Sequence, residues 1–210
     1  MRNMQDQVPR SCASVDELAS HFDIFLIDQF GVLHNGSQAF PGSPEALQRL
    51  RQLGKTCVII SNSGKRAALN AARLDNLGFP ASAYHSVMTS GEVAWNQLKQ
   101  GLVTGQINPG ARCYLLVNDA DYSLLDGLEL QSVDSVTEAD LVLLAGMGAE
   151  RLSLDAYLDL FNPVIERAIP CICTNPDKVS VSASGKHFSV GRIAEELELR
   201  GADITWIGKP

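Results

Sequence analysis

The sequence has no paired cysteines, no long apolar run and no cluster of basic residues, and each absence excludes a class of protein. Its five cysteines are odd in number and none form a Cys-x-x-Cys pair, so we expect neither a disulfide framework nor a zinc site. No apolar run approaches the ~20 residues that a membrane span requires, and we expect no membrane partner. Residues 1–10 lack the apolar core of a secretory signal. These features favour a reducing, cytoplasmic setting.

Acidic residues outnumber basic ones and give the 210-residue chain a formal net charge of -7. Contacts with nucleic-acid phosphates require clustered Lys and Arg, so we expect no nucleic-acid partner. The apolar fraction of 45% and the charged fraction of 20% are those of a globular protein that buries a sizeable core.

Short apolar runs alternate with helix-like segments along the whole chain, which predicts an α/β protein. Ser14 and Glu17 form a capping box that opens the first helix. The predicted strands span residues 25–28, 56–60, 86–90, 112–117, 141–145, 171–173 and 204–207. The predicted helices span residues 14–22, 44–53, 65–77, 91–100, 121–125, 153–168 and 191–200.

Asp28 follows the apolar residues 25–27, which do not alternate with polar ones and therefore predict a strand buried on both faces. Gly31 then lets the chain turn sharply. Ser61 follows the next predicted strand, and the intervening helix completes a βαβ unit with a right-handed crossover. We therefore expect Asp28 and Ser61 at the same sheet edge, where open α/β sheets place their ligands.

A carboxylate, a hydroxyl and a cation at strand ends could together hold a phosphoryl group. Asp28 is the candidate nucleophile, Ser61 the candidate hydrogen-bond donor, and Lys209 the cation after the last predicted strand. Each residue alone is common at a strand end, and the order of the three along the chain favours the site.

In this order the motifs resemble those of the haloacid dehalogenase (HAD) superfamily, specifically its class IIA branch of sugar-phosphate, nucleotide and pyridoxal-phosphate phosphatases. The matching segments are residues 26–33, 40–47, 54–55, 58–62, 89–90, 145–148, 173–177 and 207–210. The resemblance implies a HAD-like Rossmannoid parallel-sheet core with an inserted α/β cap domain. The implied core comprises residues 1–90 and 174–210, and the implied cap comprises residues 91–173.

The resemblance also implies an Mg²⁺-dependent phosphomonoester hydrolase that works through an aspartyl-phosphate. Asp28 would be the nucleophile and an Mg²⁺ ligand, and the backbone carbonyl of Phe30 would be a second ligand. Ser61 would hydrogen-bond the transferring phosphoryl group, and Lys209 would neutralise its charge. The partner would be a small phosphorylated substrate. The implied substrate-binding residues are Gly31, Asn62, Ser63, Asn175 and Asp177.

Two departures from the family pattern concern the activity. The second residue after the nucleophile is usually an Asp that acts as general acid and base, a role worth roughly 10²–10⁴-fold, and here it is Phe30. The family continues past Gly-Lys-Pro to an acidic loop that completes the Mg²⁺ site, whereas this sequence ends at Pro210. We therefore expect an incomplete Mg²⁺ site and a phosphatase that is weak or inactive in this form. The alternative is a non-catalytic phospho-ligand-binding or regulatory protein.

The family topology would place a further strand, which this sequence lacks, beside residues 25–28. Without that strand we expect residues 25–28 to form an apolar edge strand, which invites pairing with another chain. We therefore interpret the chain as a fragment. Homo-oligomers through that edge or through the cap are a further expectation.

His34 reads as an exposed loop histidine in preference to a replacement proton carrier. Lys65 and Arg66 read as part of a solvated helix face in preference to ligands for a substrate anion.

Overall fold

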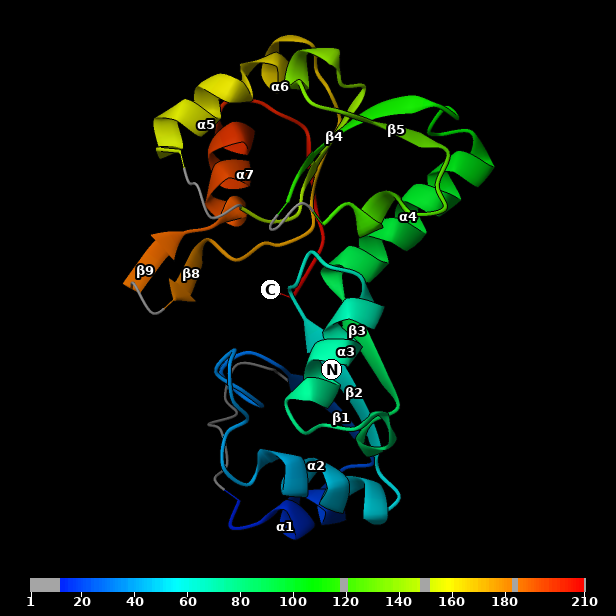
Figure 1. Ribbon diagram of the computed structural model, residues 1–210, viewed down its shortest axis with the longest axis vertical. Coiled ribbons are helices and arrows are strands. Elements are labelled where there is room, and N and C mark those ends of the chain that lie inside the picture. Colours follow the sequence, from blue (N-terminus) through cyan, green and yellow to red (C-terminus); the bar gives the residue numbers. More distant parts are fainter. Residues whose placement is uncertain (1–11, 118–120, 148–151, 183–184, 210) are drawn as a thin grey trace, which may run out of the picture. The chain divides into compact units, whose positions relative to one another are not determined.

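The computed structural model describes residues 12–117, 121–147, 152–182 and 185–209, which fall into two compact units (Figure 1). The smaller unit contains residues Met1–Ile59 and Leu74–Ser86, and the larger contains Ile60–Arg73 and Val87–Pro210. The first elements in chain order are α1 (Val15–His21), β1 (Ile24–Asp28), α2 (Ser43–Gln52), β2 (Thr56–Ser61), α3 (Ala67–Asn76), η1 (Ala81–Ala83) and β3 (Ser86–Thr89).

Local sequence signals set the first helices. The Ser14 hydroxyl accepts the N–H of Glu17 at the start of α1, as the capping box predicts. The helix α2 has Pro44 in its first turn, where its missing N–H leaves no intrahelical hydrogen bond unmade. Arg49 of α2 forms a two-pronged ion pair with Asp16 of α1, which ties the two helices together.

The strands β1, β2 and β3 form a sheet in that order, so β1 has one strand neighbour among the described residues. The predicted edge strand is thus confirmed for the described part of the chain. The prediction that it is buried on both faces is wrong, because Ile24 is 65% exposed and Leu26 is 66% exposed. Side chains alternate along a strand, and the described residues leave the face of Ile24 and Leu26 uncovered.

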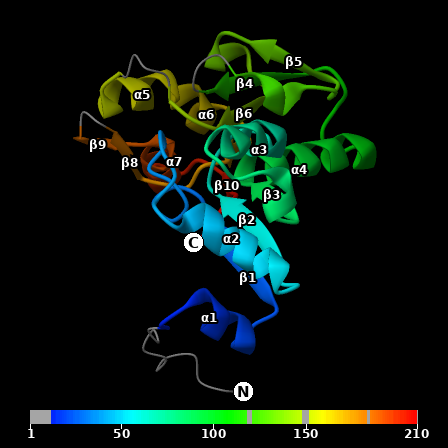
Figure 2. The ribbon, with the colours of Figure 1, turned by 60° about the horizontal axis from the view of Figure 1, so that its bottom comes forward.

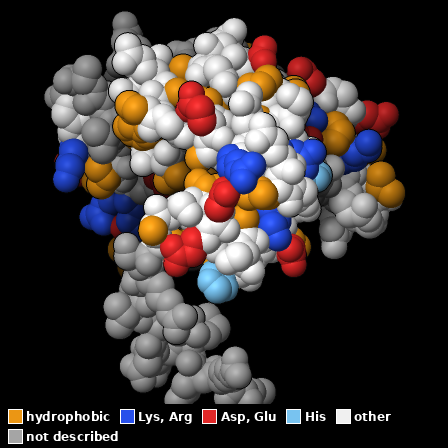
Figure 3. Space-filling view, turned by 90° about the horizontal axis from the view of Figure 1, so that it is seen from below, with side chains coloured by type: hydrophobic (Ala, Val, Ile, Leu, Met, Phe, Trp, Pro, Cys, Tyr) orange, Lys and Arg blue, Asp and Glu red, His pale blue; other side chains and the backbone are white. Residues whose placement is uncertain are grey.

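Exposed apolar side chains also occur away from β1. Figure 3 shows a face on which such side chains lie among acidic and basic ones, without a large area of one charge sign. The large apolar residues that are more than half exposed include Phe22, Phe30, Val32, Met88, Val103, Val179 and Leu199.

The larger unit is built on a five-stranded, fully parallel sheet of order β10-β7-β6-β4-β5 (Figure 2). Its strands are β4 (Ala111–Leu116), β5 (Leu130–Val133), β6 (Leu141–Leu144), β7 (Cys171–Cys173) and β10 (Ile204–Trp206). The other elements of this unit are α4 (Ser90–Thr104), η2 (Ser123–Leu125), η3 (Val136–Glu138), α5 (Leu154–Leu160), α6 (Asn162–Glu166), β8 (Val179–Ser182), β9 (Gly185–Phe188) and α7 (Val190–Leu199). The predicted α/β class with a parallel sheet is confirmed.

Both faces of the five-stranded sheet are covered by helices. Leu141 and Leu143 of β6 pack in one apolar cluster with Leu98 of α4. Val142 and Leu144 point to the other face and pack with residues of α5, α6 and α7. All four β6 side chains are therefore buried, which explains why this strand is a continuous apolar run without polar alternation.

Three local features differ from the prediction. The predicted helix 153–168 is two helices, α5 and α6, because Pro163 in the first turn of α6 lacks the N–H that a continuous helix would need. The sequence analysis did not predict β5 or the antiparallel hairpin of β8 and β9. The residues of β5 and β9 are exposed or half-buried, and β8 alternates Val with Ser, so these strands lack the apolar runs that revealed the other strands.

The pairing of β10 bears on the predicted domain boundary at Cys173, which stays a prediction. Ile204 pairs with Cys171 and Trp206 pairs with Cys173, so β10 continues the same sheet as β4, β6 and β7. The predicted boundary places residues 204–206 in the core and residues 112–117, 141–145 and 171–173 in the cap, whereas the structure joins these strands in one sheet. A three-residue apolar strand carries no signal of the sheet to which it belongs, because that choice depends on pairing distant in sequence.

The cysteines Cys57, Cys113, Cys171 and Cys173 are buried and unbridged. Burial raises the pKa of the Cys113 and Cys173 thiols to about 12, so both remain protonated near neutral pH and behave as small apolar groups. Among the described helices, none has the length and apolar character that crossing a membrane would require.

Candidate active site

The loop after β2 is stabilised by its own serine hydroxyls. The Ser61 hydroxyl accepts the N–H of Ser63 at 3.2 Å, and the Ser63 hydroxyl accepts the N–H of Lys65 at 3.3 Å. A serine that accepts a hydrogen bond retains its own O–H as a donor. Ser61 can therefore donate to a bound oxygen while its position is fixed by the loop.

Asn62 joins three segments that are far apart in the sequence. Its amide nitrogen donates to Asp177 Oδ1 at 2.8 Å, and its amide oxygen accepts the backbone N–H of Lys209 at 2.6 Å. The side chain of Asn175 in turn accepts the N–H of Asp177 at 3.1 Å. Four of the residues singled out from the sequence, Asn62, Asn175, Asp177 and Lys209, thus form one hydrogen-bonded group in the larger unit.

Gly208 makes this arrangement sterically possible. Its φ of +151° lies outside the range that other residues commonly adopt. A Cβ at this position would lie 2.5 Å from the ring of Pro176 and 2.9 Å from Asn62 Oδ1. Only glycine allows the chain to pass here and present the N–H of Lys209 to Asn62.

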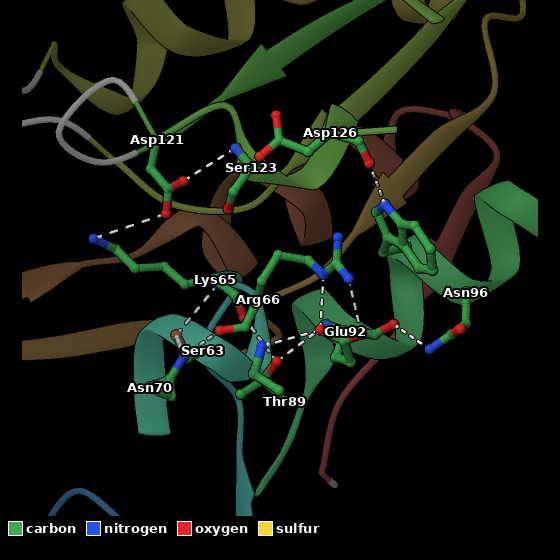
Figure 4. Close-up of polar contacts among 12 residues, drawn as sticks. Ser63, Lys65, Arg66, Asn70, Thr89, Glu92, Asn96, Asp121, Ser123 and Asp126 are labelled. Atoms are coloured by element: carbon green, nitrogen blue, oxygen red, sulfur yellow. Dashed lines mark hydrogen bonds and ion pairs between the residues drawn. The ribbon is translucent and has the colours of Figure 1, made fainter. Parts of the chain in front are cut away.

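Residues at the start of α4 form further hydrogen bonds to the loop after β2 (Figure 4). The Thr89 hydroxyl donates to the carbonyl of Lys65 at 2.7 Å and accepts the N–H of Glu92 at 3.0 Å. The Ser90 hydroxyl donates to the carbonyl of Ser61 at 3.3 Å. Sequence reasoning did not assign Thr89 and Glu92 a role, although Thr-x-x-Glu before a helix is a recognisable capping-box pattern.

Arg66 is a structural residue of this loop. Its guanidinium forms two hydrogen bonds to Glu92, at 2.7 and 3.0 Å, and stacks 4.0 Å from the ring centre of Trp95. The hydrogen bonds from Arg66 lower the pKa of the Glu92 carboxyl. The expectation that Arg66 lies on a solvated helix face is wrong, because this side chain is only 21% exposed.

The Asp28 loop belongs to the smaller unit. Asp28 is the last residue of β1, and its Oδ1 accepts the N–H of Gln29 at 2.7 Å. Gly31 has a φ of +84° and donates its N–H to the carbonyl of His34 at 2.9 Å. Ser61 is the last residue of the neighbouring strand β2. That Asp28, Ser61 and Lys209 act on one phosphoryl group stays a prediction.

His34 is buried, with 2% of its surface exposed, so the expectation of an exposed loop histidine is wrong. Its Nδ1 accepts the N–H of Gly36 at 3.0 Å, which places the ring proton of the neutral form on Nε2. The ring also meets Phe30 edge to face, with 6.2 Å between the ring centres. His34 therefore stabilises the loop, and burial separates it from a substrate in solvent.

A family model described as haloacid dehalogenase-like hydrolase matches residues 25–131, about half of the chain. The chain belongs to this family. The match begins within β1 and includes Asp28 and the Ser61–Arg66 loop.

Known proteins of this HAD-like family resemble most of the chain. Glycerol-3-phosphate phosphatase from Gallus gallus is 29% identical over 192 residues, which cover 90% of this chain and 54% of that protein. The human protein of the same name is 34% identical over 192 residues, which cover 89% of this chain and 53% of that protein. The chain thus spans about half the length of these curated relatives.

Two solved structures show the same fold. A HAD-like hydrolase from Brucella suis 1330 is 28% identical, with a TM-score of 0.82 over 94% of this chain and 70% of that chain. A glycerol phosphate phosphatase from Mycobacterium tuberculosis in complex with calcium is 26% identical, with a TM-score of 0.66 over 94% of this chain and 55% of that chain. The class IIA resemblance is confirmed by these relatives.

The residues expected to bind Mg²⁺ supply only part of a metal site. Among the described residues, no group of three or more His, Cys, Asp and Glu side chains is placed to hold a metal ion. The Asp28 carboxylate and the Phe30 carbonyl are the oxygen ligands that Mg²⁺ prefers, but Mg²⁺ demands near-octahedral coordination. These two groups fit the chemistry of the ion, and they are the ligands that the described residues would contribute.

Proposed function

We propose that this protein hydrolyses small phosphomonoesters, with Asp28 as the nucleophile. The observation that supports this most directly is the Asn62 side chain, which holds the segments of Asp177 and Lys209 beside the Ser61 loop. The three segments that Asn62 joins follow strands and carry residue types that bind phosphate. This arrangement favours a role in positioning a phosphate site over a purely structural role for the Asn62 side chain. The family supports the reaction class, since three of the four proteins named above are phosphatases.

In the proposed reaction an oxygen of Asp28 attacks the phosphorus atom, and the bond from phosphorus to the alcohol oxygen breaks. Ser61 donates a hydrogen bond to a phosphoryl oxygen, and the Lys209 ammonium balances its negative charge. Water then cleaves the aspartyl-phosphate and releases inorganic phosphate. A bound Mg²⁺, held by Asp28 and the Phe30 carbonyl, would supply further neutralisation of the phosphate charge.

Phe30 limits which phosphate esters we expect the protein to hydrolyse. It stands where the family has a second Asp, and a phenyl group cannot protonate the departing alkoxide. An alkoxide is strongly basic and needs that proton, whereas a nitrophenolate leaves without one. We therefore propose that the chain acts on aryl phosphates far better than on alkyl phosphates.

The test is hydrolysis of 4-nitrophenyl phosphate with and without Mg²⁺, on the native sequence and on Asp28→Asn. We expect Mg²⁺-stimulated turnover that Asp28→Asn abolishes. Asp159→Asn is the matched control, because it removes an exposed carboxylate from α5. Equal turnover in the native chain and in Asp28→Asn would contradict the proposal.

The second candidate is a non-catalytic protein that binds a phosphorylated ligand. Phe30 favours this candidate, because it stands at the position of the family's general acid and its phenyl group cannot supply a proton. The side chain is 52% exposed there. It predicts no turnover in the same assay and a rise in melting temperature with phosphate or a phosphomonoester. Turnover that depends on Asp28 would eliminate this alternative.

A further inference from the structure

Four consecutive residues at the start of α4, Thr89–Glu92, each contact the loop after β2. The Ser90 hydroxyl donates to the carbonyl of Ser61 at 3.3 Å, and the Gly91 N–H donates to the carbonyl of Ser63 at 3.0 Å. Both carbonyls belong to serines that we predict for the phosphate site. The first half of the loop is therefore held by its backbone from a helix that follows it in the chain.

Thr89 and Glu92 hold the second half of the loop. The Thr89 hydroxyl donates to the carbonyl of Lys65 at 2.7 Å and accepts the N–H of Glu92 at 3.0 Å. The Glu92 carboxylate accepts two hydrogen bonds from the Arg66 guanidinium and one from the N–H of Ala67, the first residue of α3. Figure 4 shows Thr89 and Glu92 between these partners. The loop is thus bonded to the start of α4 along its whole length.

Two glycines allow the loop to lie directly against its neighbours. A Cβ on Gly91 would collide with the backbone of Gly64 and Lys65, and a Cβ on Gly64 would collide with the carbonyl of Ala145. Ala145 directly follows β6. The loop therefore lies between the start of α4 and the end of β6, and a change at the start of α4 reaches it directly.

The start of α4 binds the loop and does not offer its groups to a ligand. The first N–H groups of a helix have no intrahelical acceptor and often bind anions. Here the N–H of Gly91 donates to Ser63, and the N–H of Glu92 donates to the Thr89 hydroxyl. Thr89 is 1% exposed and Ser90 is 3% exposed. An effect of these two hydroxyls on the reaction must therefore act through the loop.

We propose that Thr89 and Ser90 are positioning residues for the phosphate site, because they set the place of the Ser61 hydroxyl. The proposal rests on the phosphatase function above and adds how its phosphate-binding loop is held. Asn62 of the same loop accepts the N–H of Lys209. A loop without its hydrogen bonds to α4 would misplace both the proposed donor and the proposed cation, which weakens the binding of phosphate.

Binding of inorganic phosphate, measured by isothermal titration on the full chain, tests the proposal without any hydrolysis. Thr89→Val removes the hydroxyl and keeps the shape of the side chain, so phosphate should bind about fivefold more weakly, the equivalent of one hydrogen bond. Thr89→Ser keeps the hydroxyl and should stay within about twofold of the native affinity. A native chain that binds no phosphate would overturn the proposal, as would native affinity in Thr89→Val.

A second variant separates positioning from stability. Thr89→Val also removes the N-cap of α4 and should lower the melting temperature, whereas a purely structural role would leave the phosphate affinity of the folded protein unchanged. Ser90→Ala leaves that cap intact and removes the hydrogen bond to Ser61 itself. It should weaken phosphate binding by about threefold or more. If Thr89→Val does not fold, native affinity in Ser90→Ala refutes the proposal.

Thr104→Val is the matched control. Thr104 is exposed at the other end of α4, and its hydroxyl donates within the same helix. This variant loses the same hydroxyl group from the same helix, so it should keep the native phosphate affinity. A loss of affinity equal to that of Thr89→Val would contradict a role specific to the start of α4.

Failure of this proposal is distinguishable from failure of the phosphatase function. Phosphate binding that depends on Thr89 and Ser90 in a chain without turnover would refute hydrolysis and leave the positioning role intact. Turnover that Asp28→Asn abolishes, together with native phosphate affinity in Thr89→Val and Ser90→Ala, would refute the positioning role and leave hydrolysis intact.

Discussion

The side-chain oxygen of Asn62 accepts a hydrogen bond from the backbone N–H of Lys209, 147 residues further along the chain, at 2.6 Å. Asn62 follows β2, whereas Lys209, the proposed phosphate-binding cation, follows β10. The bond therefore fixes the backbone of Lys209 from the end of a different strand. The amide nitrogen of the same Asn62 holds Asp177. A single side chain thus sets the mutual position of three motifs.

Replacing Asn62 by Ala should therefore impair both stability and activity. Loss of two hydrogen bonds from a half-buried site should lower the free energy of unfolding by about 1–3 kcal/mol. Because Lys209 would lose its anchor, kcat/KM for an aryl phosphate should fall about tenfold or more. Urea unfolding and steady-state kinetics measure the two effects. The control is Asn96→Ala, which removes an amide that bonds within α4 alone, and equal behaviour of the two variants would contradict the role of Asn62.

A methyl group at Gly64 should destabilise the larger unit. It would meet the backbone carbonyl of Ala145, which cannot move without distorting β6 and its neighbours. Gly64→Ala should therefore cost more than about 2 kcal/mol of unfolding free energy. Gly101→Ala is the matched control, because its methyl would meet only the flexible end of the Ile107 side chain, 2.8 Å away, and Ala favours the helix. Denaturant midpoints that shift equally in the two variants would refute the close approach.

The ion pair of Arg66 and Glu92 should make stability depend on pH. The hydrogen bonds from Arg66 keep the pKa of Glu92 lower in the folded protein than in the unfolded chain. The pair therefore stabilises the fold fully above the ordinary glutamate pKa, and this contribution is lost as the pH falls through the lowered value. Glu92→Gln should cost about 1–2 kcal/mol at pH 7 and progressively less below about pH 4.

Urea unfolding at pH 7, 5 and 3.5 measures this dependence. Glu129→Gln serves as the comparison, since Glu129 is exposed and forms no ion pair with another described residue. A difference between native protein and Glu92→Gln that stays constant over the three pH values would show that the Glu92 charge does not stabilise the fold.

Restoring an acid at position 30 should broaden the substrate range. Phe30→Asp supplies a proton for the departing alkoxide, so kcat/KM for an alkyl phosphate should rise by roughly 10²-fold or more. Hydrolysis of an aryl phosphate should change far less, because its leaving group needs little help. Phe30 is half exposed, so the fold should tolerate the change. Phe30→Leu is the control, and an unchanged ratio of alkyl to aryl activity in Phe30→Asp would count against the proposed chemistry.

Local signals in the sequence determined much of the fold. The capping box at Ser14 begins α1, Pro44 begins α2, and the apolar run of β6 identifies a strand covered on both faces. The same reasoning put Asp28 and Ser61 at the ends of their strands. These features depend on residues close together in the chain, where hydrogen bonding and side-chain periodicity act directly.

The sequence alone could not determine relationships that depend on packing. The exposure of Leu26, the burial of His34 and the stacking of Arg66 on Trp95 each reversed a reasonable local expectation. The bond between Asn62 and Lys209 was equally hidden, because no periodicity links residues so far apart. Only the tertiary structure decided these contacts, since they arise where strand ends and loops meet after the whole sheet has formed. The sequence by itself determined the chemistry available at the strand ends, and the packing of the sheet decided which of those groups meet.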